Sequence, residues 1–244
     1  MAFEPIIHLM RGIQNRLNGS SLRLNGNVQD PKQIAFLRQL QKEMRQEFVL
    51  DIPLNELNVV VFDIETTGFY PNKGDEIISI GAVKVIDGKI AEDQAFYSLI
   101  QSNGEISKEI QLLTGITNEQ IKDAPPLSEV LIRFFQYVQD LPLVAHHANH
   151  EKNFLQHASW LLYKLPLKHR LIDTSFLYRI ADPQLNIVKL EDFCEYHQIP
   201  IENRHHALSD AKLTAKLWCI YIPKVQGLGC HTLRELYEQL ALIK

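Results

Sequence analysis

The sequence predicts an α/β protein in which helices flank a mixed β-sheet. Residues 58–100 contain three strand-like segments in succession, and the second and third are joined by Asp87-Gly88, a dipeptide that favours a hairpin. From residue 107 onward, helical periodicity alternates with short apolar segments at 143–146 and 171–172. Hairpin-connected strands followed by alternating helices and strands are typical of a sheet with both antiparallel and parallel neighbours.

The first 57 residues differ from the rest of the chain in composition and periodicity, and they are expected to form a helical and loop-rich N-terminal appendage. Residues 15–29 are rich in Asn, Gly and Ser without a sustained period, which indicates loop or tail. Asp30 suits a helix N-cap and Pro31 suits a first helical turn, so a helix is expected to start there. The turns that follow carry a mostly apolar face, formed by Ile34, Phe36, Leu37, Leu40 and Met44.

The remaining elements follow from local patterning. Strands are expected at residues 59–62, 76–85 and about 95–100, then at 143–146 and 171–172. Helices are expected at residues 107–113, 128–138, about 151–163, from Thr174, at 190–197, 207–222 and 232–242. The predicted organisation is an appendage at 1–57, a main α/β domain at 58–222 and a C-terminal helix within 223–244.

Length and composition fit one sizeable core in a soluble, cytoplasmic protein. The chain has 244 residues, of which 45% are hydrophobic. A net charge of −4 does not suggest a protein that coats nucleic acid by electrostatics alone, although metal ions would neutralise acidic groups locally. The three cysteines show no Cys-x-x-Cys spacing, as expected of free thiols in a reducing compartment. We expect neither a signal peptide nor a membrane span.

An acidic pair at the end of the first predicted strand is the first candidate site. Asp63 and Glu65 follow four apolar residues and are two apart, so their side chains project from the same face of a strand. Two buried carboxylates repel each other unless a cation lies between them, and oxygen ligands suit Mg²⁺ or Mn²⁺. Taken alone, however, the pair fits a strand that ends in a solvated acidic turn better than a metal site.

Two further acidic motifs lie downstream. Glu151 follows a buried strand, near the start of a helix, within Ala145-His146-x-Ala148-x-x-Glu151-x-x-Phe154-Leu155. The second motif, His205-x-Ala207-Leu208-x-Asp210-Ala211, spans a junction between loop and helix. His205 and Asp210 are five residues apart, so they converge if His205 lies in the loop and Asp210 on the first helical turns.

In this order, the three motifs resemble the DEDDh 3′→5′ exonucleases, the DnaQ-like family of the proofreading epsilon subunits of bacterial DNA polymerase III. The segment 106–118 also resembles the linking region of that family, and the resemblance covers residues 58–222. Three ordered motifs are far more specific than any one of them. The resemblance implies a ribonuclease-H-like fold and hydrolysis of phosphodiester bonds at nucleic-acid 3′ ends, with release of nucleoside 5′-monophosphates.

The resemblance also implies roles for individual residues. Two divalent ions, Mg²⁺ or Mn²⁺, would be held by Asp63, Glu65, Glu151 and Asp210. Such ions supply an activated water and stabilise the entering and leaving oxygens. His205 would be the general base, because an unperturbed imidazole pKa of about 6.5 suits proton transfer at neutral pH.

Two residues match family positions that contact the substrate. Thr66 would contact the 3′ end, and Phe69 would stack against the terminal base of single-stranded or frayed nucleic acid. A place in the core would explain Phe69 equally well. DNA is favoured as the substrate, with roles in replication or repair, while an enzyme that acts on RNA or short oligonucleotides is the alternative.

One position departs from the family pattern. The family has Asp where this chain has Glu151, which is one methylene longer, and Mg²⁺ demands near-ideal octahedral geometry. We expect activity to survive, weakened or with a preference for Mn²⁺. The alternative from another class is a catalytically impaired module that binds nucleic acid or a polymerase.

Two other signals have simpler explanations. The cluster His146, His147, His150 and His157 lacks a His-Glu-x-x-His zinc motif, because position 154 is Phe, so loop roles and roles beside the site are favoured. The C-terminal segment 239–243 resembles peptides that bind sliding clamps, which would make a clamp or DNA polymerase a partner. An apolar helical face that packs in the core explains the same residues better, namely Leu233, Leu236, Tyr237, Leu240 and Ile243.

Overall fold

The computed structural model describes residues 31–44, 48–102 and 104–243, where five strands form one mixed sheet in the order β3-β2-β1-β4-β5. The three longer strands are antiparallel neighbours: β1 (Val59–Thr66), β2 (Ile77–Ile86) and β3 (Lys89–Leu99). The short strands β4 (Leu143–Ala145) and β5 (Leu171–Asp173) run parallel to β1. The prediction of a mixed sheet flanked by helices is therefore confirmed.

The expected hairpin joins β2 to β3. Asp87 and Gly88 both have positive φ angles, 48° and 71°, as a tight two-residue turn requires, and Asn58 Oδ1 accepts the Asp87 N–H at 2.9 Å. Strand β3 begins at Lys89 rather than near residue 95. Its first half is largely exposed at the edge of the sheet, so backbone pairing with β2 holds it without the alternating pattern that predicts strands.

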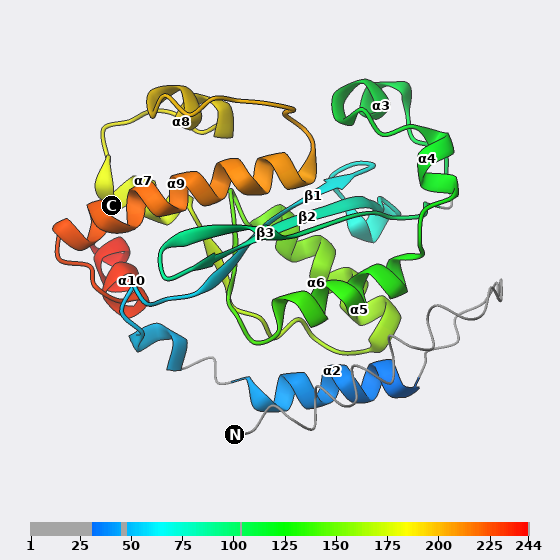
Figure 1. Ribbon diagram of the computed structural model, residues 1–244, viewed down its shortest axis with the longest axis horizontal. Helices are drawn as coiled ribbons and strands as arrows, with labels where there is room; N and C mark the ends of the chain where they lie inside the picture. The colour runs from blue at the N-terminus through cyan, green and yellow to red at the C-terminus, as the bar shows by residue number, and fades with distance from the viewer. Residues whose placement is uncertain (1–30, 45–47, 103, 244) are drawn as a thin grey trace.

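Alternation along β1 divides the core into two layers (Figure 1). Val59 and Val61 face a cluster built with α7 (Ser175–Ala181), α8 (Leu190–Tyr196), α9 (Ala207–Gly227) and α10 (Leu233–Leu242). Val60, Phe62 and Ile64 face the opposite cluster, which contains residues of α5 (Leu127–Val138) and α6 (Asn149–Tyr163). A third, smaller cluster lies at the short helices α3 (Lys108–Thr114) and α4 (Asn118–Lys122).

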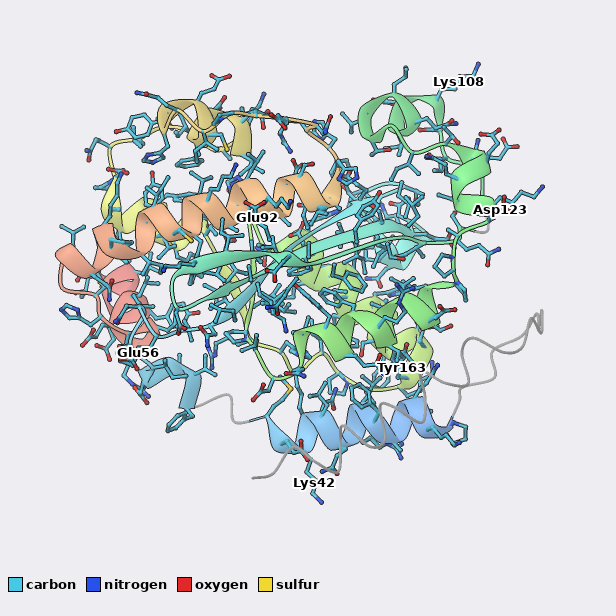
Figure 2. The ribbon with its side chains drawn as sticks, in the orientation of Figure 1. Lys42, Glu56, Glu92, Lys108, Asp123 and Tyr163 are labelled. Carbon is cyan, nitrogen blue, oxygen red and sulfur yellow. The ribbon has the colours of Figure 1, made fainter. Side chains whose placement is uncertain are left out.

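The expected N-terminal helix is present as α2 (Pro31–Glu43), and it packs beside α5. Phe36 and Leu37 are buried in the second cluster, and Gln41 Nε2 donates to the Pro166 carbonyl at 2.7 Å. Figure 2 shows Lys42 on the outer side of α2, pointing away from the sheet. The loop expected at residues 15–29 lies outside the described residues.

Helix α9 is longer than the sequence predicts. It continues through Pro223 to Gly227, although proline removes one backbone donor and usually ends a helix. Tyr221, Ile222 and Val225 are buried in the first cluster on both sides of Pro223, so tertiary packing holds the last turns. Two 3₁₀ turns, η1 (Phe48–Asp51) and η2 (Pro71–Lys73), were also not predicted.

Two predictions made from composition concern membrane-spanning helices and the state of the three cysteines. In the part of the chain that is described, no helix combines the length and apolarity needed to cross a membrane. All three cysteines, Cys194, Cys219 and Cys230, are free thiols, and burial raises the pKa of each.

Candidate metal centre and active site

Three carboxylates meet where the end of β1 approaches the start of α9. Ligand oxygens of Asp63, Glu65 and Asp210 all lie within 4.8 Å of one another. Asp63 and Glu65 project from the β1 face that is covered by α9, and Asp210 lies in the first turn of that helix. Within residues 31–44, 48–102 and 104–243, no other group of His, Cys, Asp and Glu is arranged to hold a metal ion. We call these three residues the acidic cluster.

A glycine in β2 permits this approach of helix and sheet. Gly81 is paired with Asp63 in the β1–β2 ladder. A Cβ atom at residue 81 would lie 2.1 Å from Leu208 N and 2.3 Å from the Ala207 carbonyl carbon, distances that no real Cβ can adopt. The first turn of α9 therefore lies directly on the β2 backbone, and this contact places Asp210 beside β1.

Convergence of like charges perturbs the acidic cluster. Burial, followed by the charges of Glu151, Glu65 and Asp210, raises the pKa of Asp63 well above its ordinary value. Burial and the charge of Asp210 raise the pKa of Glu65 to about 8. A bound cation would reverse both shifts, because it stabilises the ionised carboxylates.

Arg204 supplies the positive charge that lies against the cluster. Its Nη1 donates to Asp210 Oδ2, and its Nη2 donates to Glu191 Oε2 at 2.9 Å. Although burial acts against it, these two carboxylates raise the pKa of Arg204 above its ordinary value. Arg204 was not among the predicted site residues, and its signal in the sequence is its position directly before His205.

Glu151 lies near the cluster, in the first turn of α6 just after β4. Its side chain is buried, and within the described part of the chain its Oε2 has no hydrogen-bond partner. Burial, followed by the charges of Asp173 and Glu65, raises the pKa of Glu151 to about 8. Glu151 is near enough to raise the pKa of Asp63 but is not part of the group within 4.8 Å.

The donor set fits divalent cations. Two buried carboxylate oxygens here, Asp210 Oδ1 and Glu151 Oε2, have no hydrogen-bond partner among the described residues. Such oxygens cost free energy unless a donor or a cation satisfies them. An all-carboxylate set is the chemistry that hard ions such as Mg²⁺ and Mn²⁺ prefer.

His205 lies in the loop before α9, as expected. Its backbone N–H donates to Asp210 Oδ2 at 3.2 Å, so the two residues meet through the backbone. The backbone of His205 is left-handed, with φ at 60°, and the residue is half-buried. The next residue, His206, stacks on Tyr97 of β3 at 4.5 Å between ring centroids, which fixes the loop against the sheet.

The two expected substrate contacts lie beside Glu151. Thr66 Oγ1 donates to the Gly68 carbonyl at 2.7 Å and lies 3.3 Å from His150 Nε2. Phe69 meets the His150 ring edge-on, with 5.9 Å between centroids, and is 77% exposed. Phe69 is therefore not a core residue.

The histidines near α6 have other partners. Nε2 of His146 and Nε2 of His147 each lie 2.9 Å from the Val188 carbonyl oxygen. Among the described residues, no histidine belongs to a group that could hold a metal ion. Asp173 accepts the backbone N–H groups of Ala148 and Ser175, at 3.1 Å and 2.8 Å, and so connects the starts of α6 and α7.

The C-terminal helix α10 packs against the core through its apolar face, which was the favoured explanation of residues 239–243. Leu233 and Leu236 are buried in the first cluster, and three further side chains pack against it, namely Tyr237, Leu240 and Ile243. Thr232 caps the helix through a reciprocal capping box with Glu235. Leu242 is exposed.

Residues 60–218 match a protein-family model, RNase_T, whose description is exonuclease. The chain is 37% identical over 181 residues to the PolC-type DNA polymerase III of Caldanaerobacter subterraneus subsp. tengcongensis, which covers 74% of this chain and 13% of that protein. It is 33% identical over 184 residues to the 3′-5′ exonuclease DinG of Bacillus subtilis, covering 75% and 19%. The chain thus spans less than a third of the length of such relatives.

Solved structures share the fold. The nuclease domain of 3′hExo, a DEDDh family member bound to rAMP, superposes with a TM-score of 0.60 at 21% identity, covering 72% of this chain and 94% of that one. Exonuclease X in complex with 5′ overhanging duplex DNA gives 0.57 at 22% identity, covering 75% and 99%. The expected ribonuclease-H-like fold of the DEDDh exonucleases is confirmed.

Proposed function

Because the chain belongs to the exonuclease family, we propose that it removes nucleotides one at a time from the 3′ ends of single-stranded or frayed nucleic acid, with DNA favoured. The observation that carries this proposal is the convergence of Asp63, Glu65 and Asp210 within 4.8 Å. The similarity of this chain to DNA polymerase III proteins favours DNA over RNA as its substrate.

The acidic cluster and Glu151 would hold two divalent ions, Mg²⁺ or Mn²⁺. When bound, such ions acidify water and stabilise negative charge on the entering and leaving oxygens. Asp63, Glu65 and Asp210 are fixed by β1 and α9, so they hold their oxygens in place before a cation binds. Glu151 would complete the set from α6 with its Oε2, which no described residue hydrogen-bonds.

His205 would accept the proton of the attacking water. The water oxygen forms a bond to phosphorus, and the bond from phosphorus to the 3′ oxygen of the preceding nucleotide breaks. That oxygen takes up a proton and becomes the new 3′ hydroxyl of the shortened strand, while the terminal nucleotide leaves as a nucleoside 5′-monophosphate. The hydrogen bond between the His205 backbone and Asp210 keeps this residue next to the acidic cluster. Thr66 would contact the 3′ terminus, and Phe69 would stack on the terminal base.

Digestion of matched DNA and RNA oligonucleotides tests the proposal. We expect stepwise shortening of a 5′-labelled single strand from its 3′ end with Mg²⁺ or Mn²⁺, and no shortening with a chelator. Preference for the DNA strand supports DNA as the substrate, whereas preference for RNA would reverse that assignment. If the protein binds the strand but does not shorten it with either ion, the alternative of a catalytically impaired binding module is favoured. Glu151 would then be the first residue to test as the cause.

Association with a DNA polymerase is a further part of the proposal, and the DNA polymerase III relatives support it. The cytoplasmic location, and the division at residues 57 and 222 into appendage, exonuclease domain and C-terminal helix, stay predictions. The clamp-peptide prediction for residues 239–243 loses support, because Leu240 and Ile243 already pack against the core.

A further inference from the structure

An open groove of about 530 Å³ lies beside the candidate site, between α6 and the loop that follows β1. Three exposed aromatic side chains line it, Phe69, Tyr70 and Trp160, with exposed fractions of 77%, 58% and 57%. Polar side chains complete its lining, among them Lys73, Asn153 and His157. We call this feature the aromatic groove.

The lining of the aromatic groove is suited to nucleobases and phosphates. Large exposed aromatic faces offer stacking surface that any base can use. Lys73 Nζ lies 4.3 Å from the centroid of the Tyr70 ring, so a cation accompanies the stacking surface. The residues that line the groove, all within the described part of the chain, include no Asp or Glu. The groove thus contrasts with the acidic cluster in charge, although the net charge of the chain is −4.

The loop side of the groove is held in place. Asp75 Oδ2 accepts the Tyr70 N–H at 2.8 Å. The same carboxylate fills the space where a Cβ of residue 68 would lie, since that atom would come within 2.4 Å of Asp75 Oδ2. Tyr70 and Phe69 are therefore presented by a tight loop, and little ordering remains for a ligand to impose.

The groove is continuous with the candidate active site. Phe69 meets His150, His150 lies 3.3 Å from Thr66 Oγ1, and Glu151 is the next residue along α6. Trp160 lies further along the same helix. A strand with its 3′ end at the acidic cluster would therefore reach Phe69 first and the remainder of the groove afterwards.

We propose that the aromatic groove is a second nucleic-acid subsite, which binds bases of the substrate strand beyond the terminal nucleotide by stacking on Tyr70 and Trp160. The continuity of the groove with the candidate site and the positive charge of Lys73 favour a nucleic-acid strand as its ligand. The inference rests on the proposed exonuclease function, because it takes the same strand as its ligand.

Intrinsic fluorescence tests binding without catalysis. The chain has two tryptophans, and Trp218 is 2% exposed, so a ligand in the groove reports through Trp160. We expect a twelve-residue oligothymidylate, added with a chelator, to quench the emission of the wild type and of Leu161→Ala, but not of Trp160→Ala. Leu161 is the matched control because it is exposed on α6 and does not line the groove. Quenching that persists in Trp160→Ala, or is absent from the wild type, would overturn the proposal.

Kinetics separate this inference from the proposed function. We expect Trp160→Ala to raise KM for the twelve-residue strand by about 5- to 100-fold, the equivalent of one lost stacking contact. Hydrolysis of the p-nitrophenyl ester of thymidine 5′-monophosphate should be unchanged, because this substrate has no base beyond the terminal nucleotide. Leu161→Ala should match the wild type on both. Equal KM values in all three proteins would refute the subsite while the exonuclease stands. Failure of the wild type to hydrolyse either substrate would refute the proposed function, and the fluorescence titration would still decide the subsite.

Discussion

The two sides of the candidate metal centre are built differently. On one side, Asp63 and Glu65 lie on a strand paired along its whole length with β2, and Asp210 lies on a helix of 21 residues docked against Gly81. On the other side, Glu151 lies in the first turn of α6, after a strand of three residues. The first side takes its geometry from the backbone, whereas the second depends on how one longer side chain is placed.

The two sides also differ in charge balance. Asp210 contacts Arg204, which gives the acidic cluster a resident positive charge. The charged groups that shift the pKa of Glu151 are the carboxylates Asp173 and Glu65, both of which raise it. Buried carboxylates that repel one another favour the uptake of cations, and a bound cation would offset the repulsion on the Glu151 side, where Asp173 and Glu65 raise the pKa.

Neutralising one carboxylate of the acidic cluster should have the largest effect. Asp63→Asn removes one ligand charge, so we expect exonuclease activity to fall below detection. In the presence of a chelator the same change should raise the thermal midpoint, because it relieves repulsion from Glu65, Glu151 and Asp210. Activity assays together with thermal melts with and without Mg²⁺ measure both effects. A variant that loses activity and is also less stable without metal would contradict the repulsion argument.

Removal of the proposed base should have the next largest effect. His205→Ala leaves the carboxylates and the backbone contact to Asp210 in place, and we expect kcat to fall by about 10² to 10⁴. Single-turnover rates on a 5′-labelled strand check this. Turnover near that of the wild type would exclude His205 as the base.

Shortening the side chain of Glu151 tests the second side of the candidate metal centre. Glu151→Asp restores the residue type of the resembled family but withdraws the carboxylate by one methylene, and a displacement of that size costs up to about 10²-fold. If the site is tuned to glutamate, the variant is slower than the wild type with both Mg²⁺ and Mn²⁺. A faster variant, above all with Mg²⁺, would show that Glu151 impairs the wild-type site.

The pH dependence of stability should show the smallest effect. The folded-state pKa values of Glu65 and Glu151, about 8, exceed the ordinary value of 4.5, so the native state binds more protons and loses stability as pH rises through this interval. The lowered pKa values of His146, His150 and His169 act in the opposite direction below their ordinary value of 6.5. With a chelator, the thermal midpoint should therefore fall from pH 6.5 to 8.

The matched control for this effect is Glu65→Gln combined with Glu151→Gln. That double variant should have a flatter profile between pH 6.5 and 8, since it cannot lose the two protons. An identical slope in the wild type and the double variant would mean that other groups control stability in this interval.

Much of the fold and of the acidic cluster follows from local pattern. The i, i+2 spacing placed Asp63 and Glu65 on one face of β1, and the loop before α9 accommodates His205 as expected. Arg204 was missed because its contacts with Asp210 and Glu191 depend on how the irregular loop before α9 folds between α8 and α9, which no periodicity in the sequence predicts. The aromatic groove was missed for a similar reason: Tyr70 and Trp160 are 90 residues apart in the sequence, and no periodicity connects a tight loop to a helix face.

Gly81 bears on how variants of this chain should be interpreted. Ala in its place would add a single uncharged methyl group, and residue 81 carries no chemistry, so a comparison of residue properties would classify the change as mild. The added atom would instead collide with the backbone of Ala207 and Leu208 and separate Asp210 from β1. Loss of function at this position would therefore report on the spacing between helix and sheet rather than on any catalytic group.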